Sequence, residues 1–202
     1  MFGIVRIIIG CIVFGCAAVL VRKSKVTGKP MWFTVCIGIS LALTVALAFL
    51  PFENLFVTFR SPQDAYQYYT FGEPNIVLVI EGEACDLVVD RKNASETHLI
   101  IPKTADGWKI GMGRDTKKIT QTFADGISVD VYQYKDTDAF FITVFNSNGG
   151  GSTVSDVYGT KFYALEETND LLGKTFVTYY GALSSFDSQY WVEVNGNKLS
   201  VK

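Results

Sequence analysis

The chain has little cysteine and histidine, and these shortages exclude several kinds of site. Its 202 residues include four cysteines and one histidine, of which only Cys85 and His98 lie beyond residue 54. A disulfide within residues 55–202 is therefore excluded, as is a zinc site of cysteine and histidine ligands, which needs about four of them. Gly-x-Ser-x-Gly is also absent from the sequence, so no motif favours a serine triad. We expect no cofactor and no metal.

Cys85 and His98 form the sharpest catalytic candidate, because imidazole can activate a thiolate nucleophile. Their spacing argues against this role. If the two strands that carry them pair as an antiparallel hairpin, His98 lies opposite Val89 and Cys85 lies opposite Pro102. An offset of four residues at about 3.3 Å each separates them by roughly 13 Å along the strands. That distance is too long for proton transfer, so we expect two structural residues.

Apolar sequence is concentrated near the start of the chain. Two uncharged runs, residues 7–21 and 31–50, flank a basic loop at residues 22–30. A helix made from the second run reaches roughly 30 Å, the thickness of a hydrocarbon core. The pattern predicts a transmembrane hairpin over residues 1–54, with spans at about residues 2–22 and 31–50. The loop carries four cations and no acid, so we expect it in the cytoplasm and both termini outside, in a two-pass protein of the cell membrane.

Charge separates the two parts of the chain. Residues 1–54 hold five basic residues and one acidic residue, which leaves thirteen of the 18 basic and nineteen of the 20 acidic residues in 55–202. Residues 55–202 therefore have a net charge of −6, and a domain of this charge is not expected to bind nucleic acid. The expected partners are the bilayer and either another membrane protein or a cell-wall component.

Three small residues, Gly38, Ala42 and Ala46, recur at every fourth position of the second apolar run. Small side chains let another helix backbone approach closely within a membrane. The stripe is thus a candidate helix-packing face. We favour packing between the two helices of one hairpin, and the alternative is a docking face for another membrane protein or a second copy.

The remainder of the chain is punctuated by turn residues and rich in branched and aromatic residues. Ser61 can cap a short helix that starts at Pro62, and this helix is expected to lie on the sheet that follows. Asn195 and Gly196 indicate a hairpin with a two-residue type I′ turn. The pattern predicts a mainly antiparallel β domain over residues 55–202, a sandwich, meander or partly closed barrel with one short helix. The predicted strands are 75–80, 85–90, 97–101, 108–112, 118–122, 127–134, 139–146, 152–157, 161–166, 175–181, 189–194 and 198–201.

Aromatic residues in the β domain offer a candidate binding surface, because they supply large contact areas with polar tips. The residues are Tyr132, Tyr134, Tyr179, Tyr190 and Trp191. In a β domain such residues more often fill the core or form cross-strand pairs, and we favour that structural interpretation.

Carboxylates occur in pairs at predicted turns. Glu81 and Glu83 flank Gly82, and Asp136 and Asp138 flank Thr137. None belongs to a complete calcium loop, so solvated turn residues are the simpler interpretation. A glycoside hydrolase pair stays open, because its two acids can lie far apart in sequence.

The sequence thus predicts a non-catalytic, membrane-anchored accessory, binding or sensing protein of the cell envelope. Two alternatives stay open. One is an envelope hydrolase that acts on glycan or peptide with carboxylates that the sequence does not identify. The other is a structural subunit of a membrane complex.

Overall fold

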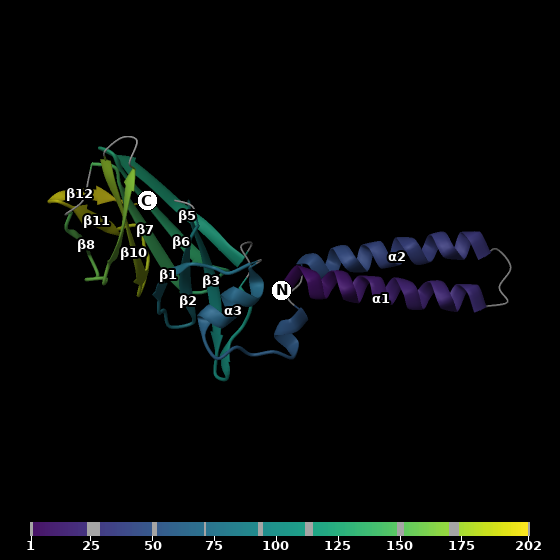
Figure 1. Cartoon of the computed structure of the whole chain (residues 1–202). Coiled ribbons are helices and arrows are strands. Elements are labelled where there is room, and N and C mark those ends of the chain that lie inside the picture. The colour runs from purple at the N-terminus through teal and green to yellow at the C-terminus, as the bar shows by residue number, and fades with distance from the viewer. Residues whose placement is uncertain are drawn as a thin grey trace.

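In the computed structural model, a hairpin of two helices projects from a β domain (Figure 1). The structure describes residues 2–23, 29–49, 52–70, 72–92, 95–111, 115–148, 152–169 and 174–201. Its helices are α1 (Phe2–Lys23), α2 (Lys29–Phe49), the short 3₁₀ helix η1 (Phe52–Leu55) and α3 (Pro62–Tyr69).

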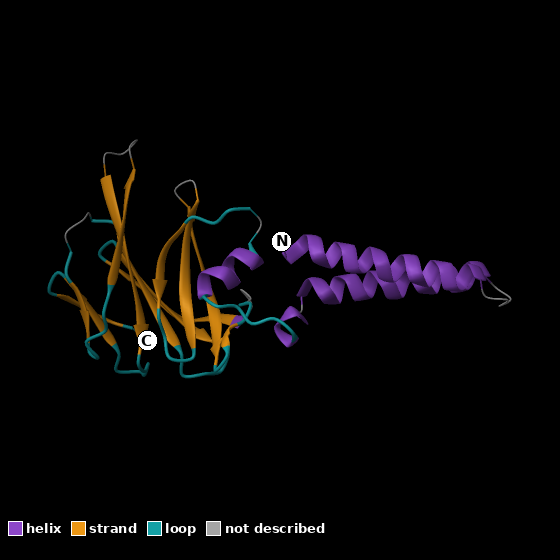
Figure 2. Ribbon diagram, turned by 60° about the horizontal axis from the view of Figure 1, so that its bottom comes forward, coloured by secondary structure: helices purple, strands orange, loops and turns teal. Residues whose placement is uncertain are grey.

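The β domain contains three antiparallel sheets (Figure 2). The first has the order β1 (Ile76–Ile80), β2 (Cys85–Lys92), β3 (Ser95–Thr104), β4 (Gly107–Trp108). The second has the order β5 (Thr116–Ala124), β6 (Ile127–Tyr134), β7 (Phe140–Asn146), β10 (Lys174–Leu183), β9 (Tyr163–Asn169). The third has the order β12 (Asn197–Ser200), β11 (Trp191–Val194), β8 (Val154–Asp156). The prediction of a mainly antiparallel β domain is confirmed.

The sheets are stacked, and side-chain alternation along each strand explains how. On β2, Leu87 and Val89 join a core with Phe141 of the second sheet, whereas Val88 joins a core with Ala65 of α3. The second sheet is likewise apolar on both faces, and its other face packs on the third sheet. That core contains Val129, Val131, Ile142, Val144, Val192 and Val194. The layer order is therefore α3, first sheet, second sheet, third sheet.

Local signals in the sequence set several elements. The Ser61 side chain accepts a hydrogen bond from the Asp64 backbone N–H at 3.1 Å, and Pro62 occupies the first turn of α3. Asn195 and Gly196 have φ values of 54° and 83°, as the predicted β11–β12 turn requires.

One predicted strand, 108–112, is shorter in the structure and ends at Trp108. The side chain of Asn54, next to η1, takes the place of a strand partner. Its Oδ1 accepts from the Ile110 N–H at 2.7 Å and its Nδ2 donates to the Ile110 carbonyl at 3.1 Å. This contact also fastens the end of the hairpin to the β domain.

The two long helices lie side by side along their length (Figure 1). Gly10 on α1 and Ser40 on α2 are buried between them, and the rings of Phe14 and Phe33 meet edge to face with centroids 6.3 Å apart. In the described part of the chain, neither helix is both long enough and apolar enough to cross a membrane. The prediction of a hairpin is therefore supported, and the prediction of transmembrane spans at residues 2–22 and 31–50 is not. The middle of the basic loop, residues 24–28, lies outside the described residues.

Candidate functional site

The five aromatic residues predicted as a binding surface do not share a surface. Tyr134 is buried between the first and second sheets, and Tyr179 and Tyr190 are buried between the second and third. Tyr132 and Trp191 are half-buried. The Trp191 ring lies beneath the Lys198 ammonium, whose Nζ is 3.9 Å from the ring centroid. Three of the five residues therefore fill the core.

The small-residue stripe faces away from α1. Gly38, Ala42 and Ala46 are all exposed, and a Cβ placed on Gly38 would meet no atom within 4 Å. Contacts between α1 and α2 run along a different side of α2, which carries Ser40. The docking role of the stripe stays a prediction.

We expect Ala42→Leu to abolish crosslinking of the full chain to a membrane partner or a second copy, because leucine prevents close backbone approach. The measurement is crosslinking and copurification from a gentle detergent. Val45→Leu is the control, since Val45 is also exposed on α2. Equal association of the two variants would remove any special role for the stripe.

Cys85 and His98 lie where the sequence placed them. Cys85 pairs with Pro102 and His98 pairs with Val89, so the two side chains are separated along the hairpin. Burial raises the pKa of the Cys85 thiol to about 12, with a further contribution from the charge of Asp86. Burial lowers the pKa of His98, against the opposing effect of Asp130. Both groups are neutral at physiological pH, and they form no dyad.

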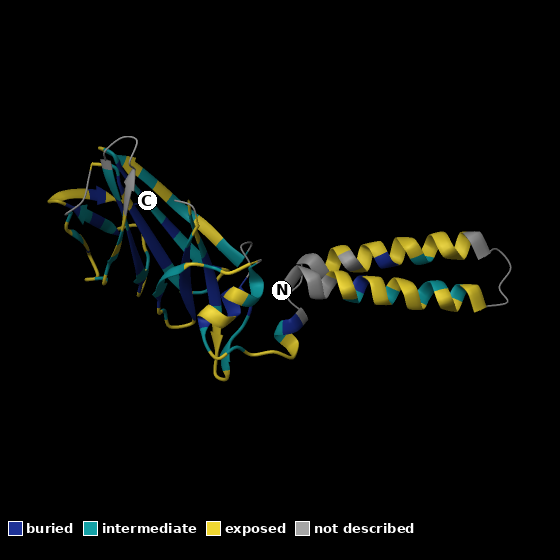
Figure 3. Cartoon of the chain, in the orientation of Figure 1, coloured by how far each residue is buried: buried dark blue, intermediate teal, exposed yellow. Residues whose placement is uncertain are grey.

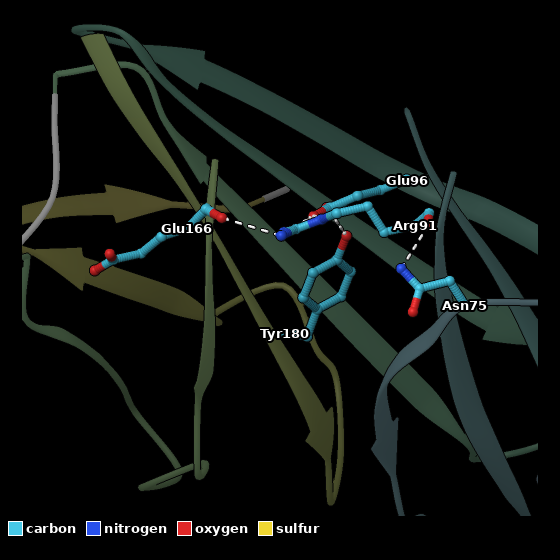
Figure 4. A network of polar contacts seen from close by, with 5 residues as sticks. All are labelled: Asn75, Arg91, Glu96, Glu166 and Tyr180. Carbon is cyan, nitrogen blue, oxygen red and sulfur yellow. Dashed lines mark hydrogen bonds and ion pairs between the residues drawn. The ribbon is translucent and has the colours of Figure 1, made fainter. Parts of the chain in front are cut away.

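A network of polar contacts joins the first and second sheets (Figure 4). Arg91 on β2 forms an ion pair with Glu96 on β3, with Nε 3.0 Å from Oε1. Glu96 Oε2 accepts from the Tyr180 hydroxyl of β10 at 2.7 Å, and Arg91 Nη1 donates to the Glu166 carbonyl of β9 at 3.1 Å. The Asn75 side-chain amide donates to the Arg91 carbonyl at 3.1 Å. These contacts fix how the two sheets stack.

A second polar group lies farther along the same interface. The rings of His98 and Tyr132 are 4.8 Å apart, and Asp130 Oδ2 accepts from Lys118 Nζ at 3.0 Å and from the Tyr132 hydroxyl at 3.3 Å. Burial, followed by the charge of Asp130, raises the pKa of Tyr132. The Lys118–Asp130 ion pair joins β5 to β6, whereas the contact between the Tyr132 hydroxyl and Asp130 lies within β6.

Carboxylates that are distant in the sequence meet at a cleft of about 520 Å³. Glu81 and Glu83 from the β1–β2 turn, together with Asp138 before β7, surround a floor that includes Phe140 and Phe141. A catalytic acid usually gains its proton affinity from burial, and all three carboxylates are exposed. Within the described residues, no group of three or more histidine, cysteine or acidic residues is placed to hold a metal ion. Among the described residues, the acids of this cleft are thus solvent-exposed carboxylates, as expected for residues at turns.

A second pocket, of about 400 Å³, lies beside α3 on the outer face of the first sheet. The residues that matter for its chemistry are Tyr66, Tyr69, Glu73, Asp90, Lys92 and Thr97. These residues form no motif in the sequence. A signal in the sequence was Asp90, a carboxylate that shares the alternating face of β2 with Asp86 and Val88.

Comparison of the chain with protein families, curated proteins and solved structures finds no match. The function must therefore be argued from the molecule alone.

Proposed function

We propose that the protein is a non-catalytic accessory or binding protein of the cell envelope. In this proposal its helical hairpin is anchored in a membrane and its β domain faces the extracytoplasmic side. The observation that carries the proposal is the apolar surface of the hairpin.

Most of the described residues along both helices are exposed (Figure 3). Apolar side chains are distributed around α1 without a preferred face, a pattern of helices enclosed by other apolar groups. The most exposed are Ile7, Ile12 and Leu20 on α1 and Met31, Ile39 and Leu41 on α2, each at least 59 % exposed. Water is a poor environment for such a surface, and a bilayer or a membrane protein would cover it.

The direction of the hairpin supports the proposed orientation. The first residues of α1 and the last residues of α2 lie at the end of the hairpin nearest the β domain (Figure 1). Arg22, Lys23 and Lys29 lie at the opposite end. Cations that flank a short loop favour its retention in the cytoplasm, which would place the β domain outside.

A binding role is supported by the chemistry of the β domain. Cys85 and His98 are far apart along the hairpin, the acids around the cleft of about 520 Å³ are exposed, and the pocket beside α3 contains a buried carboxylate. The hydrolase alternative would depend on the exposed acids of that cleft. A structural subunit of a membrane complex would use the same hairpin for its attachment, and it would need no ligand in the pocket beside α3.

Protease accessibility tests this proposal. A tag placed after Lys202 should be digested when protease is added to intact cells or protoplasts, and a tag inserted at Thr27 should be protected until the membrane is opened. The chain should stay in the membrane pellet after alkaline carbonate extraction, because its attachment is apolar.

The opposite digestion pattern would contradict the orientation. Release of the chain by carbonate would contradict the anchor itself. A variant with acidic residues at Ile12 and Ile39 serves as the control, since both side chains are exposed on the hairpin and charges there should prevent membrane association.

A further inference from the structure

The chain between the hairpin and α3 exposes three consecutive apolar residues. Leu55, Phe56 and Val57 follow one another at the end of η1, and they are 77 %, 82 % and 39 % exposed. Among the described residues, Phe56 and Leu55 are the most exposed of the large apolar side chains, ahead of every one on the hairpin. Contiguous exposed apolar groups mark interaction sites, because water is a poor environment for them. We call residues 55–57 the apolar turn.

The apolar turn lies beside the end of the hairpin. Figures 1 and 2 both show the short helix between α2 and α3 next to the end of the hairpin nearest the β domain. Residues 50 and 51 alone separate Phe49, the last residue of α2, from Phe52, the first residue of η1. Three Cα–Cα steps of about 3.8 Å keep Phe52 within about 11 Å of Phe49. Because the interfacial layer of a bilayer is about 5 to 8 Å thick, a hairpin that ends at the hydrocarbon core holds the turn near this layer.

The backbone beside the apolar turn is fastened to the β domain. The Asn54 side chain bonds both backbone groups of one residue just beyond β4. Lys109 Nζ donates to the Val57 carbonyl at 2.9 Å. Phe59 and Trp108 exchange two backbone hydrogen bonds, of 2.8 and 3.0 Å. The uncovered side chains of the turn therefore have a fixed place on the β domain.

The turn exposes side chains while its own backbone donors are paired. The N–H groups of Phe56 and Val57 both donate to the Glu53 carbonyl, at 2.9 and 2.7 Å. Pairing of this kind matters at a membrane, because an unsatisfied backbone donor is costly in an apolar environment. The turn can thus enter such an environment without losing hydrogen bonds to water.

The charges beside the apolar turn favour a phospholipid surface. Glu53 is 5 % exposed, whereas Arg60 is exposed. Lys109 adds a second cation next to the Val57 carbonyl. Arginine and lysine form charge-assisted hydrogen bonds with phosphate, which phospholipid headgroups carry. Apolar side chains with cations beside them are typical of segments that lie in a membrane interface.

We propose that the apolar turn inserts into the boundary between headgroups and acyl chains of the bilayer leaflet next to the β domain. Because the turn is fastened to the β domain, its insertion holds that domain against the membrane in a fixed orientation. The proposal rests on the proposed membrane anchor, and it adds a second, interfacial contact to it.

Spin-label accessibility in the full chain tests the insertion. The three hairpin cysteines are replaced with alanine, and Cys85 stays because it is fully buried. A nitroxide is attached at Phe56→Cys, and the chain is reconstituted into vesicles of phosphatidylcholine and phosphatidylglycerol. Power saturation compares collisions with oxygen, which concentrates in lipid, and with a nickel chelate, which stays in water. Phe123→Cys is the matched control, since Phe123 is a 72 % exposed phenylalanine on β5.

We expect the ratio of oxygen to nickel accessibility to be about threefold higher at residue 56 than at residue 123, because an inserted side chain is surrounded by lipid. A label at Leu55→Cys should give the same result, and it replaces Phe56→Cys if that variant does not fold. Equal ratios at residues 56 and 123 would overturn the insertion. Low accessibility to both reagents at residue 56 would also overturn it, because a second copy or another protein would then cover the turn.

A label at Ile39→Cys reports separately on the anchor, since Ile39 is exposed on α2. A lipid-like ratio at residue 39 together with a water-like ratio at residue 56 would leave the anchor standing and overturn the insertion. Water-like ratios at both positions would contradict the anchor as well.

A distance measurement tests the fixed orientation. Labels at Ile39→Cys and Phe123→Cys in one chain should give a single narrow distance distribution by pulsed electron paramagnetic resonance in the same vesicles. Adding Leu55→Ser and Phe56→Ser should broaden this distribution, because the turn then loses its apolar contact with the bilayer. Val157→Ser is the control, since Val157 is also exposed, and it should leave the width unchanged. A width that the serine variants do not alter would show that the turn does not hold the β domain in place.

Discussion

Raising the pH above about 10 should unfold the β domain, with a loss in the free energy of unfolding of about 1.4 kcal/mol per pH unit for each of Tyr180 and Tyr190. Burial raises the pKa of both hydroxyls far above the usual value of 10, and so do the hydrogen bonds and charges of Glu96 and Asp156. Both side chains are at most 3 % exposed. Ionisation of either tyrosine is therefore unfavourable in the folded chain.

The sign of this effect follows from proton binding. Below pH 10 both tyrosines keep their protons in the folded and unfolded chain, so neither contributes a pH dependence. Above pH 10 the unfolded chain releases the protons of both tyrosines, which the folded chain retains, and the unfolded state is favoured. At pH 12 the loss should reach about 5 kcal/mol, comparable to the whole stability of many domains.

Circular dichroism during denaturant titrations at pH 8 to 12 would measure the loss. Tyr190→Phe should reduce the slope above pH 10 by about 1.4 kcal/mol per pH unit, because one titrating group is gone. A stability that is flat between pH 10 and 12 would contradict the prediction.

Replacing Asp156 with alanine should lower the free energy of unfolding by about 3 kcal/mol. Asp156 ends β8, is 7 % exposed, and collects four hydrogen bonds. Its Oδ2 accepts from the Tyr190 hydroxyl at 2.8 Å and from Thr160 Oγ1 at 2.5 Å. Its Oδ1 accepts from the backbone N–H groups of Thr160 at 2.8 Å and Tyr158 at 3.1 Å. Alanine leaves all four donors without this acceptor.

A double-mutant cycle separates the contact between the Tyr190 hydroxyl and Asp156 from the other hydrogen bonds of Asp156. Asp156→Asn keeps one carbonyl acceptor and should cost only about 1 kcal/mol. The double variant Asp156→Ala/Tyr190→Phe should lose less free energy of unfolding than the sum of the two single variants. In the single Asp156→Ala variant the buried Tyr190 hydroxyl is left without an acceptor, and in the double variant this hydroxyl is absent. Additive costs, measured by urea unfolding, would show that Tyr190 and Asp156 do not interact.

Local elements of the fold could be predicted because the sequence encodes them over a few residues. Ser61 and Pro62 start α3 as expected, and β6 has the predicted bounds 127–134. The β2–β3 register places His98 opposite Val89, so the pairing of Cys85 with His98 could be rejected from the sequence. These predictions depend on backbone conformation and hairpin geometry, which are local.

Predictions that depend on packing between distant segments agree less well with the structure. The strand expected at 108–112 is cut short by Asn54, which lies more than fifty residues upstream. Three of the five aromatic residues, Tyr134, Tyr179 and Tyr190, divide between two cores, because the second sheet is covered on both faces. Periodicity identifies an apolar strand but does not say how many layers will cover it.

The sequence by itself determined the apolar hairpin and the antiparallel β domain, and it excluded a disulfide and a cysteine–histidine zinc site within residues 55–202, because composition and local pattern suffice for these. Only the tertiary structure decided which carboxylates keep a partner. Asp86 and Asp90 lie on one face of one strand, yet the donors that reach Asp86 come from Gly82 and Trp108. Whether a buried group is satisfied depends on which distant segments fold against it, and among the described residues none donates to Asp90 Oδ1 or Asp130 Oδ1.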